Sequence, residues 1–316
     1  MQQVNPYFEA GFAEFFIIFA QRIGKLLTGQ LGVSDLVSDE IQLFVLIFIT
    51  LSCACIGTFL VLKKMTMLAN SLSHTILLGI VIAFLIGKSA FGVHTMDMKT
   101  LCIAALSTGL FTTVCTQMLY KGFKLQEDAS IGLTFTTLFA LGIVLVSIFT
   151  RNTHLGVEAI MGNIDALHFN DLKLVFFLFL FNLFLTIIFF KPLAVSTFDP
   201  ILGASFGIPL VFISYLLMVQ TAASAIGAFR ALGAFLFLAL LVAPVLTARF
   251  FTHDLKKMIY LASLIGIGAS LLAVALSRHL LSVYELSLST AGLVTLLLGM
   301  FFLFGLLKRT LQSVKL

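Results

Sequence analysis

The chain has 316 residues, of which 60% are hydrophobic and only 10% are charged. A soluble domain carries about a quarter charged residues, so this composition excludes an ordinary soluble protein and predicts an all-α polytopic membrane protein with the lipid bilayer as its solvent. The formal net charge of +5 does not indicate nucleic-acid binding, because the basic residues stand in short loops between apolar runs, where they set membrane topology.

The N-terminal segment, residues 1–40, is expected to lie at the membrane surface. Its apolar run at 8–27 is interrupted by charged and polar residues, namely Glu9, Glu14, Gln21, Arg22 and Lys25. Such a run is more typical of an interfacial amphipathic helix than of a span. The first five residues carry no basic region ahead of an apolar core, so no cleavable signal peptide is expected.

Nine apolar runs follow, each close to the roughly 20 residues that a helix needs to cross hydrocarbon. They cover residues 41–62, 68–87, 101–119, 131–150, 172–190, 210–227, 231–250, 258–277 and 288–307. Only Ala228-Phe229-Arg230 separates the sixth and seventh runs, so this region is either a turn or a broken helix, and the count is eight or nine. We expect one transmembrane domain at 41–307 and a cytoplasmic tail at 308–316.

The loops differ in basic residues. One side holds eleven of them: Lys63, Lys64, Lys121, Lys124, Lys191, Arg249, Lys256, Lys257, Lys308, Arg309 and Lys315. The other side holds five: Lys88, Lys99, Arg151, Lys173 and Arg278. Because Lys and Arg concentrate in cytoplasmic loops, the first side is expected to be cytoplasmic, with the C-terminus inside.

A polar cluster interrupts the second run, with Asn70, Ser71, Ser73 and His74 where lipid-facing residues would stand. In a helix, Asn70 and His74 share one face. Polar groups inside a bilayer usually face a bundle interior or a water-filled path. Two interpretations stay open: hydrogen-bonded contacts between helices, or a site on a path, where a histidine would suit a transition metal or a proton.

The cytoplasmic loop at 198–209 predicts a short helix of about two turns. Asp199 is a good N-cap, Pro200 suits the first helical position, and Gly207 suits the position after the helix end. The small residues Gly203, Ala204 and Ser205 between them allow close approach of another protein. The alternative is an ordinary connecting turn.

Other polar positions favour structural interpretations. Glu127 and Asp128 lie at a helix start, where they complement the helix dipole and can cap free amides. Arg230 is expected to hold carbonyl groups at a helix junction, and Pro244 predicts a kink. The four cysteines lie in apolar runs and are expected to be small buried hydrophobic residues.

The loop at 151–171 has the spacing of metal ligands in two pairs, His154 with Glu158 and Asp165 with His168. An acidic docking surface for a partner protein is the favoured interpretation of this loop. The chain lacks the motifs of phosphate-binding loops and of hydrolases, so nothing in the sequence favours an enzyme.

Five stretches, in order over residues 41–307, together resemble the permease subunits of ATP-binding-cassette (ABC) importers for manganese, zinc or iron. They are Lys63-Lys64-Met65 with Asn70-Ser71-Leu72-Ser73-His74, Gln126-Glu127-Asp128-Ala129-Ser130-Ile131-Gly132, Phe198-Asp199-Pro200 with Gly207-Ile208-Pro209, Phe229-Arg230-Ala231-Leu232-Gly233, and the run from Ala239 through Pro244 to Arg249. The resemblance implies the fold of a metal or metal-chelate importer permease, in a bacterial inner membrane.

The resemblance also implies partners. Two permease subunits, identical or related, would form the path, and cytoplasmic ABC ATPases would dock on the coupling segments at 198–209. An extracytoplasmic metal-binding protein would deliver the ion. The chain itself would bind no cofactor and catalyse no reaction, since ATP would bind to the partner subunits and the divalent metal would be cargo.

In that family a basic pair and Met precede an acidic residue and then Ala-Leu-Ser-His, and the acidic residue and the His contact the metal. These two positions correspond to Asn70 and His74, with Ser71 and Ser73 between them. The histidine is kept, but the carboxylate is replaced by a neutral and weaker oxygen ligand. Two hypotheses follow: a related second permease supplies the carboxylate, or the chain prefers a softer metal bound through histidine.

Two other functions remain as alternatives. The first is a permease of the same architecture for a metal chelate, such as a siderophore or cobalamin complex. The second is a polytopic membrane enzyme, which would need paired carboxylates, a Ser/His pair or a zinc motif within its spans, and the spans show none.

Overall fold

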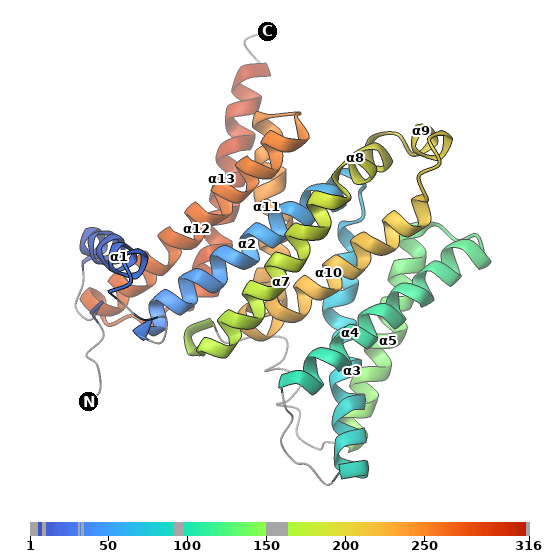
Figure 1. Ribbon diagram of the computed structural model, residues 1–316, viewed down its shortest axis with the longest axis horizontal. Helices are drawn as coiled ribbons and strands as arrows, with labels where there is room; N and C mark the ends of the chain where they lie inside the picture. Colours follow the sequence, from blue (N-terminus) through green and yellow to red (C-terminus); the bar gives the residue numbers. More distant parts are fainter. Residues whose placement is uncertain are drawn as a thin grey trace.

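The computed structural model describes residues 6–7, 11–30, 32, 35–91, 98–149 and 164–313 of the chain. The elements within these ranges are helical and include no β-strand, which confirms the expected all-α class (Figure 1). They are α1 (Phe12–Leu27), α2 (Ser38–Leu62), α3 (Thr66–Phe91), α4 (Met98–Gln117), the π-helix η2 (Met118–Gly122), α5 (Glu127–Phe149), the 3-10 helix η3 (Ile164–Ala166), α7 (Phe169–Ile188), α8 (Phe190–Phe198), α9 (Pro200–Ser205), α10 (Leu210–Leu232), α11 (Ala234–Phe251), α12 (Leu255–Tyr284) and α13 (Thr290–Ser313).

Seven helices in the described part of the chain are long and apolar enough to cross a membrane, by length and composition: α2, α5, α7, α10, α11, α12 and α13. This count is slightly below the expected eight or nine. The other two expected spans, at 68–87 and 101–119, fall on α3 and α4, which have 26 and 20 residues. Both helices pack in the same bundle, against α5 and α10.

The long helices form two groups, which α10 joins. In the large group, α2 packs against α7, α11 and α12, and α13 packs against α11 and α12. In the small group, α3 packs against α4 and α5. The two groups lie side by side in Figure 1, and α10 contacts α3 and α4 on one side and α2, α7 and α11 on the other. The small group carries the polar cluster of the second apolar run.

Helix α2 is the centre of the large group, since most of its side chains are buried. Glycines allow close approach at its crossings. A Cβ on Gly57 would overlap the carbonyl oxygen of Leu241 in α11, and a Cβ on Gly266 in α12 would overlap the Thr50 side chain. Small residues at such crossings let helix backbones pack closely in lipid, where the hydrophobic effect does not drive helices together.

The expected turn at Ala228-Phe229-Arg230 is wrong in position. Helix α10 continues through these residues to Leu232, and the break falls on Gly233, whose φ is +81°. A glycine adopts this left-handed backbone without steric cost, whereas Ala228 and Phe229 have side chains that are buried in the helix packing. The sixth and seventh runs are therefore separate helices linked by one residue.

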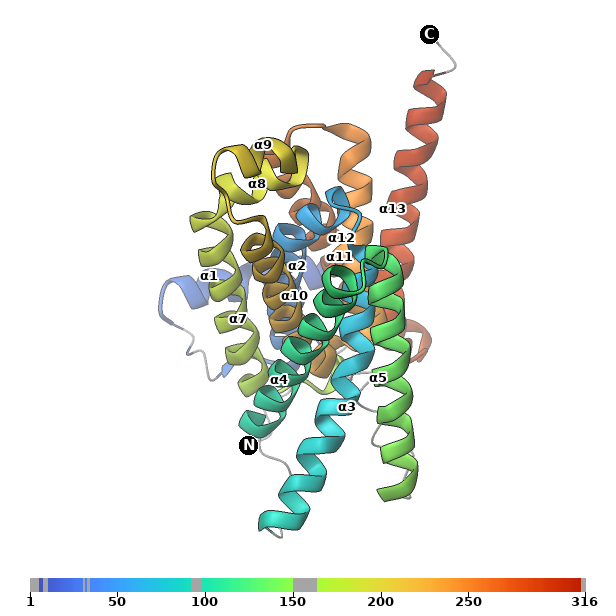
Figure 2. The same cartoon turned by 90° about the vertical axis from the view of Figure 1, so that its right-hand side faces the viewer.

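Helix α1 is the helix expected within residues 8–27. It is seen nearly end-on in Figure 1, where α2 and α12 run across the view, so it lies crosswise to them (Figures 1 and 2). It contacts α12, and Phe15 is buried while Ile17 is exposed. The crosswise helix has the amphipathic character that residues 1–40 predicted, and its place at a membrane surface stays a prediction.

Candidate functional site

The polar cluster stands on the first turns of α3. Helix α2 ends at its C-cap Lys63, Lys64 adopts a positive φ of 61°, and the buried Met65 donates its amide to the Leu60 carbonyl at 2.8 Å. This tight turn leads directly into α3 at Thr66. Asn70 and His74 are both half-buried, one helical turn apart, as the spacing predicted.

His74 faces α5. Its ring lies against Phe135 and Phe139, with centroid separations of 5.3 and 5.2 Å. Its Nδ1 is buried and has no hydrogen-bond partner among the described residues, and the same holds for the Ser71 hydroxyl, which is 3% exposed. Buried polar groups are normally hydrogen-bonded, so an unpaired atom calls for an explanation such as a ligand or a water. Hydrogen bonding between helices does not account for these two atoms.

Two members of the predicted site need separate mention. The side chain of Ser73 lies outside the described part of the structure, so its direction is not assigned. Asn70 takes part in an interaction, so it differs from the Ser71 hydroxyl and His74 Nδ1, which have no hydrogen-bond partner among the described residues. The cluster therefore presents a half-buried His–Asn face with two unpaired buried atoms.

A row of buried threonines on α4 was missed by the sequence analysis. Thr108, Thr112 and Thr116 recur every four residues, and each hydroxyl donates to the carbonyl four residues earlier. A Cβ on Gly79 of α3 would overlap Thr108, so this threonine lies at the crossing of α3 and α4. The four-residue spacing of threonine was a signal available in the sequence, and it places hydroxyl groups beside the helix that carries His74.

The loop at 198–209 forms the predicted short helix. Asp199 is the N-cap of α9, and its side chain accepts a hydrogen bond from the Leu202 amide at 2.9 Å, while Pro200 begins the helix. At the other end, Gly207 has a φ of +74°, and the amides of Gly207 and Ile208 donate to the carbonyls of Ala204 and Gly203, each at 3.0 Å. These two bonds form a Schellman motif, which ends the helix at the predicted glycine.

Helix α9 presents apolar side chains at the surface. Ile201 is 84% exposed and Phe206 is 70% exposed. Gly203 is buried, and a Cβ there would lie 3.2 Å from the Leu210 side chain, so this glycine lets the helix pack against α10. Ala204 and Ser205 are exposed with the apolar pair. The predicted role of this surface in docking another protein stays a prediction.

The remaining predicted residues lie apart from His74. Glu127 and Asp128 are the first two residues of α5; Asp128 is exposed, and the side chain of Glu127 is outside the described part. The side chain of Arg230 is also outside it. Pro244 is buried within α11. Cys53 and Cys55 are free and buried, as expected of small hydrophobic residues.

The two pairs with metal-ligand spacing at 151–171 differ in outcome. His154 and Glu158 lie outside the described residues. The Asp165 carboxylate accepts hydrogen bonds from Gln42 at 2.9 Å and Thr290 at 2.8 Å, and His168 is the N-cap of α7. Within the described ranges, no group of three His, Cys, Asp or Glu residues is placed to hold a metal ion. Asp165 is thus engaged with neutral donors from α2 and α13.

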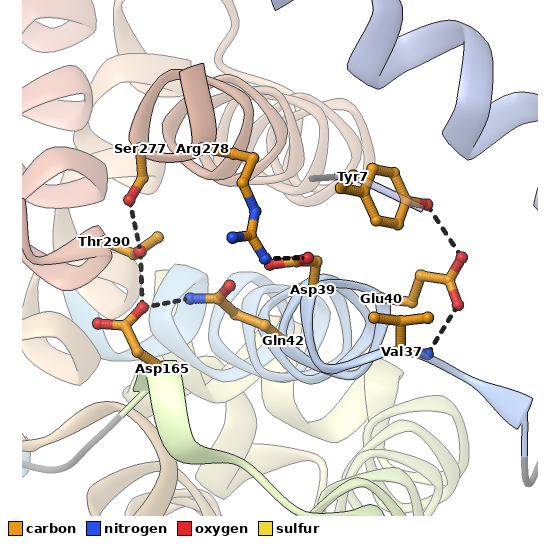
Figure 3. A network of polar contacts seen from close by, with 9 residues as sticks. All are labelled: Tyr7, Val37, Asp39, Glu40, Gln42, Asp165, Ser277, Arg278 and Thr290. Atoms are coloured by element: carbon orange, nitrogen blue, oxygen red, sulfur yellow. Dashed lines mark hydrogen bonds and ion pairs between the residues drawn. The ribbon is translucent and has the colours of Figure 1, made fainter. Parts of the chain in front are cut away.

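A second polar region, not expected from the sequence, surrounds the start of α2 (Figure 3). Asp39 forms an ion pair with Arg278 of α12, and Glu40 pairs with Arg22 of α1 and accepts a hydrogen bond from the Tyr7 hydroxyl at 2.9 Å. Burial, with a further contribution from Glu40, raises the pKa of Tyr7, so the hydroxyl stays protonated and donates. The only signal for these ion pairs in the sequence was that acidic residues precede the first apolar run and a basic residue follows the eighth.

Comparison with known proteins places the chain. The ABC 3 transport family matches residues 41–309. A probable metal transport system membrane protein of Chlamydia muridarum is 40% identical over 300 residues, covering 95% of this chain and 93% of that protein. A manganese transport system membrane protein of Bacillus subtilis is 36% identical over 234 residues, covering 70% of this chain and 77% of that protein.

Among solved structures, PsaBC from Streptococcus pneumoniae in complex with a Fab is similar over 91% of this chain and 95% of the matched chain, with a TM-score of 0.71 and 26% identity. This match agrees with the helical bundle described above. Since the family match spans residues 41–309 and both relatives align over most of the chain, this multi-pass membrane protein belongs to the ABC 3 transport family.

Proposed function

We propose that this chain is the permease subunit of an ABC importer and forms part of the path for a divalent transition metal, namely manganese, iron or zinc. The observation that carries the proposal is the half-buried Asn70–His74 face on α3, where His74 Nδ1 and the Ser71 hydroxyl have no hydrogen-bond partner among the described residues. A neutral imidazole is a good ligand for transition metals. The names of the Chlamydia and Bacillus relatives support a metal as the cargo.

Asn70 stands where the family has an acidic residue, so the carboxylate ligand is expected to come from a second permease chain. Asn70 and His74 are half-buried in the single chain, so their face has room for contacts from a partner. We propose that the path is completed by a second permease, either a copy of this chain or a related one that supplies the acidic ligand. A dication bound by one imidazole and one amide oxygen alone would lack a compensating negative charge.

The test measures uptake of Mn²⁺, Zn²⁺ and Fe²⁺ by cells that carry the complete transporter, normalised to the permease in the membrane. His74→Ala is expected to abolish uptake, and Asn70→Asp to preserve or increase it, because a carboxylate is a stronger ligand for a divalent ion. His253→Ala is the matched control, since His253 is exposed in the turn before α12. Normal uptake by a correctly inserted His74→Ala variant would show that the site is assigned wrongly.

The orientation and the coupling to ATP are also proposed. The end of the bundle with α9 and the Lys63–Lys64 turn holds most of the basic loop residues, so we assign it to the cytoplasm, together with the C-terminus. Partner ATPases would dock on α9 and drive alternating access, and an extracytoplasmic binding protein would deliver the ion at the opposite end. Exposed Ile201 and Phe206 support α9 as the docking surface.

Docking is tested by co-purification of the ATPase from cells that express the whole transporter. Ile201→Asp is expected to reduce the recovered ATPase, because a charge replaces the most exposed apolar side chain of α9. Leu286→Asp is the control at the opposite end of the bundle, where Leu286 is also exposed. Equal recovery of ATPase with both variants would show that α9 is not part of the interface.

A further inference from the structure

A network of polar side chains joins four segments (Figure 3), and it lies at the end of the bundle opposite α9 (Figure 1). Asp39 of α2 pairs with Arg278 of α12. Asp165 of η3 accepts hydrogen bonds from Gln42 of α2 and Thr290 of α13. The Thr290 and Ser277 hydroxyl oxygens lie 3.2 Å apart, which connects α13 to α12. We call these six residues the end clasp: Asp39, Gln42, Asp165, Ser277, Arg278 and Thr290.

The end clasp connects three helices of the large group to η3. At η3 the chain returns from the small group to the large group. The elements α2, α12 and α13 belong to the large group, and η3 precedes α7. At the opposite end, the small group begins after the tight turn at Lys64 and the buried Met65. The small group, with Asn70 and His74, therefore lies in the chain between two points held against the large group, at Met65 and at Asp165.

The contacts of Asp165 do not require its charge. Both hydrogen bonds reach its Oδ1 from neutral donors, an amide and a hydroxyl. An asparagine offers the same carbonyl oxygen in the same place, whereas an alanine offers none. The asparagine and alanine variants therefore separate the hydrogen bonds of Asp165 from its negative charge.

A cavity of about 260 Å³ adjoins the end clasp, and Asp165, Gln42 and Thr290 line it. At roughly 30 Å³ each, it has room for several waters. Water in this cavity can solvate Gln42 and Thr290 when the Asp165 side chain is removed. The Asp165→Ala variant is thus expected to fold, because no polar group is left buried without a partner.

We propose that Asp165 is a positioning residue for transport. By tying η3 to α2 and α13, it holds the chain at the place where it returns to the large group, while α3, α4 and α5 move during the transport cycle. The inference rests on the proposed function, because it concerns the movement of the helix that carries the metal-contacting face. The proposal assigns Asp165 no contact with the metal.

The test compares Mn²⁺ uptake kinetics for Asp165→Ala and Asp165→Asn in the complete transporter. Loss of two hydrogen bonds is expected to lower the maximal rate per permease about tenfold in Asp165→Ala, with KM for Mn²⁺ unchanged. Asp165→Asn is expected to transport like the wild type. Asp35→Ala is the control, because the Asp35 side chain lies outside the end clasp and accepts a local hydrogen bond from the Gly32 amide at 3.1 Å.

Three results would overturn the inference. If the rate per permease is unchanged in Asp165→Ala, whether or not the amount of protein falls, Asp165 has a structural role or none. An equal loss in Asp165→Asn would show that the charge is needed. A raised KM in both variants would indicate metal capture. Failure of the proposed function is distinguishable, because the wild type itself would then take up no Mn²⁺, Zn²⁺ or Fe²⁺.

A disulfide provides a second test. Ser277→Cys with Thr290→Cys places two thiols where the hydroxyl oxygens are 3.2 Å apart. If the end clasp stays closed through the cycle, the oxidised variant takes up Mn²⁺ at the same rate as the same variant kept in reductant. Loss of uptake on oxidation, restored by a reductant, would mean that α12 and α13 separate during transport and that the clasp is not a fixed point.

Discussion

The polar face of α3 and the end clasp both consist of side chains that a bilayer disfavours, yet their hydrogen bonding differs. In the end clasp, the carboxylates and the arginine are paired across elements. On α3, His74 Nδ1 and the Ser71 hydroxyl are buried without a partner in the described residues. Paired groups hold a structure together, whereas a buried group without a partner costs stability and is available to a ligand.

The largest effect is expected from Arg278→Ala. It removes the arginine of the Arg278–Asp39 ion pair, in which the two side chains are 18% and 11% exposed. Removing one member of a buried pair costs about 3 kcal/mol. Thermal unfolding of the purified permease in detergent measures the loss. The double variant Asp39→Asn/Arg278→Leu should recover part of it, and failure of the double variant to recover any stability would assign the loss to packing.

A smaller effect is expected from Glu40→Gln. The amide oxygen can still accept from Tyr7, but the charge that pairs with Arg22 is lost. A hydrogen bond to a charged group is worth about 1.5 kcal/mol, and this change should loosen α1 in particular. Hydrogen exchange of the α1 amides measures it. Glu14→Gln is the control, since the Glu14 carboxylate accepts a hydrogen bond from the Gly11 amide within the same helix start. Equal exchange in both variants would contradict the role of the Arg22–Glu40 pair.

Two buried serines sharpen the comparison further. Ser224 of α10 accepts a hydrogen bond from Asn182 of α7 at 2.7 Å, whereas the Ser71 hydroxyl is unpaired. Ser224→Ala is expected to cost about 1 kcal/mol, and Ser71→Ala to cost close to nothing or to stabilise the protein. Thermal unfolding of both variants side by side measures the difference. A larger loss for Ser71→Ala would show that its hydroxyl does have a structural partner.

Of these variants, His74→Leu is expected to have the smallest effect on stability. It is also expected to show the largest loss of transport. Leucine fills the space against Phe135 and Phe139 and removes a buried atom that makes no hydrogen bond. The unfolding temperature should stay the same or rise. Metal uptake should be lost in the same preparation. A strongly destabilised His74→Leu variant would place His74 with the structural groups.

The sequence was sufficient for features that depend on neighbouring residues. The apolar runs predicted the helices, and Asp199, Pro200 and Gly207 predicted both ends of α9, because capping is decided within a few residues. The shared face of Asn70 and His74 followed from helical spacing. The break at Gly233 was misplaced by a few residues, because burial of Ala228 and Phe229 in the bundle keeps α10 helical past that point.

Contacts between distant segments could not be predicted in the same way. Asp39 and Arg278 are 239 positions apart, and Gln42 and Asp165 are 123 apart, so only the packing of the bundle brings them together. Asp165 looked like half of a metal-ligand pair by its spacing to His168. Its actual neighbours come from the starts of α2 and α13, which local sequence does not reveal.

The single residue between α10 and α11 has a mechanical consequence. Consecutive Cα atoms are about 3.8 Å apart, so the end of α10 and the start of α11 cannot separate or slide past one another by more than a few ångström. Gly233, with its φ of +81°, therefore allows the angle between the two helices to change but not the distance between their ends. At this end of the bundle α10 must travel with α11 and the large group, so its other end is where it can bend to follow α3 and α4.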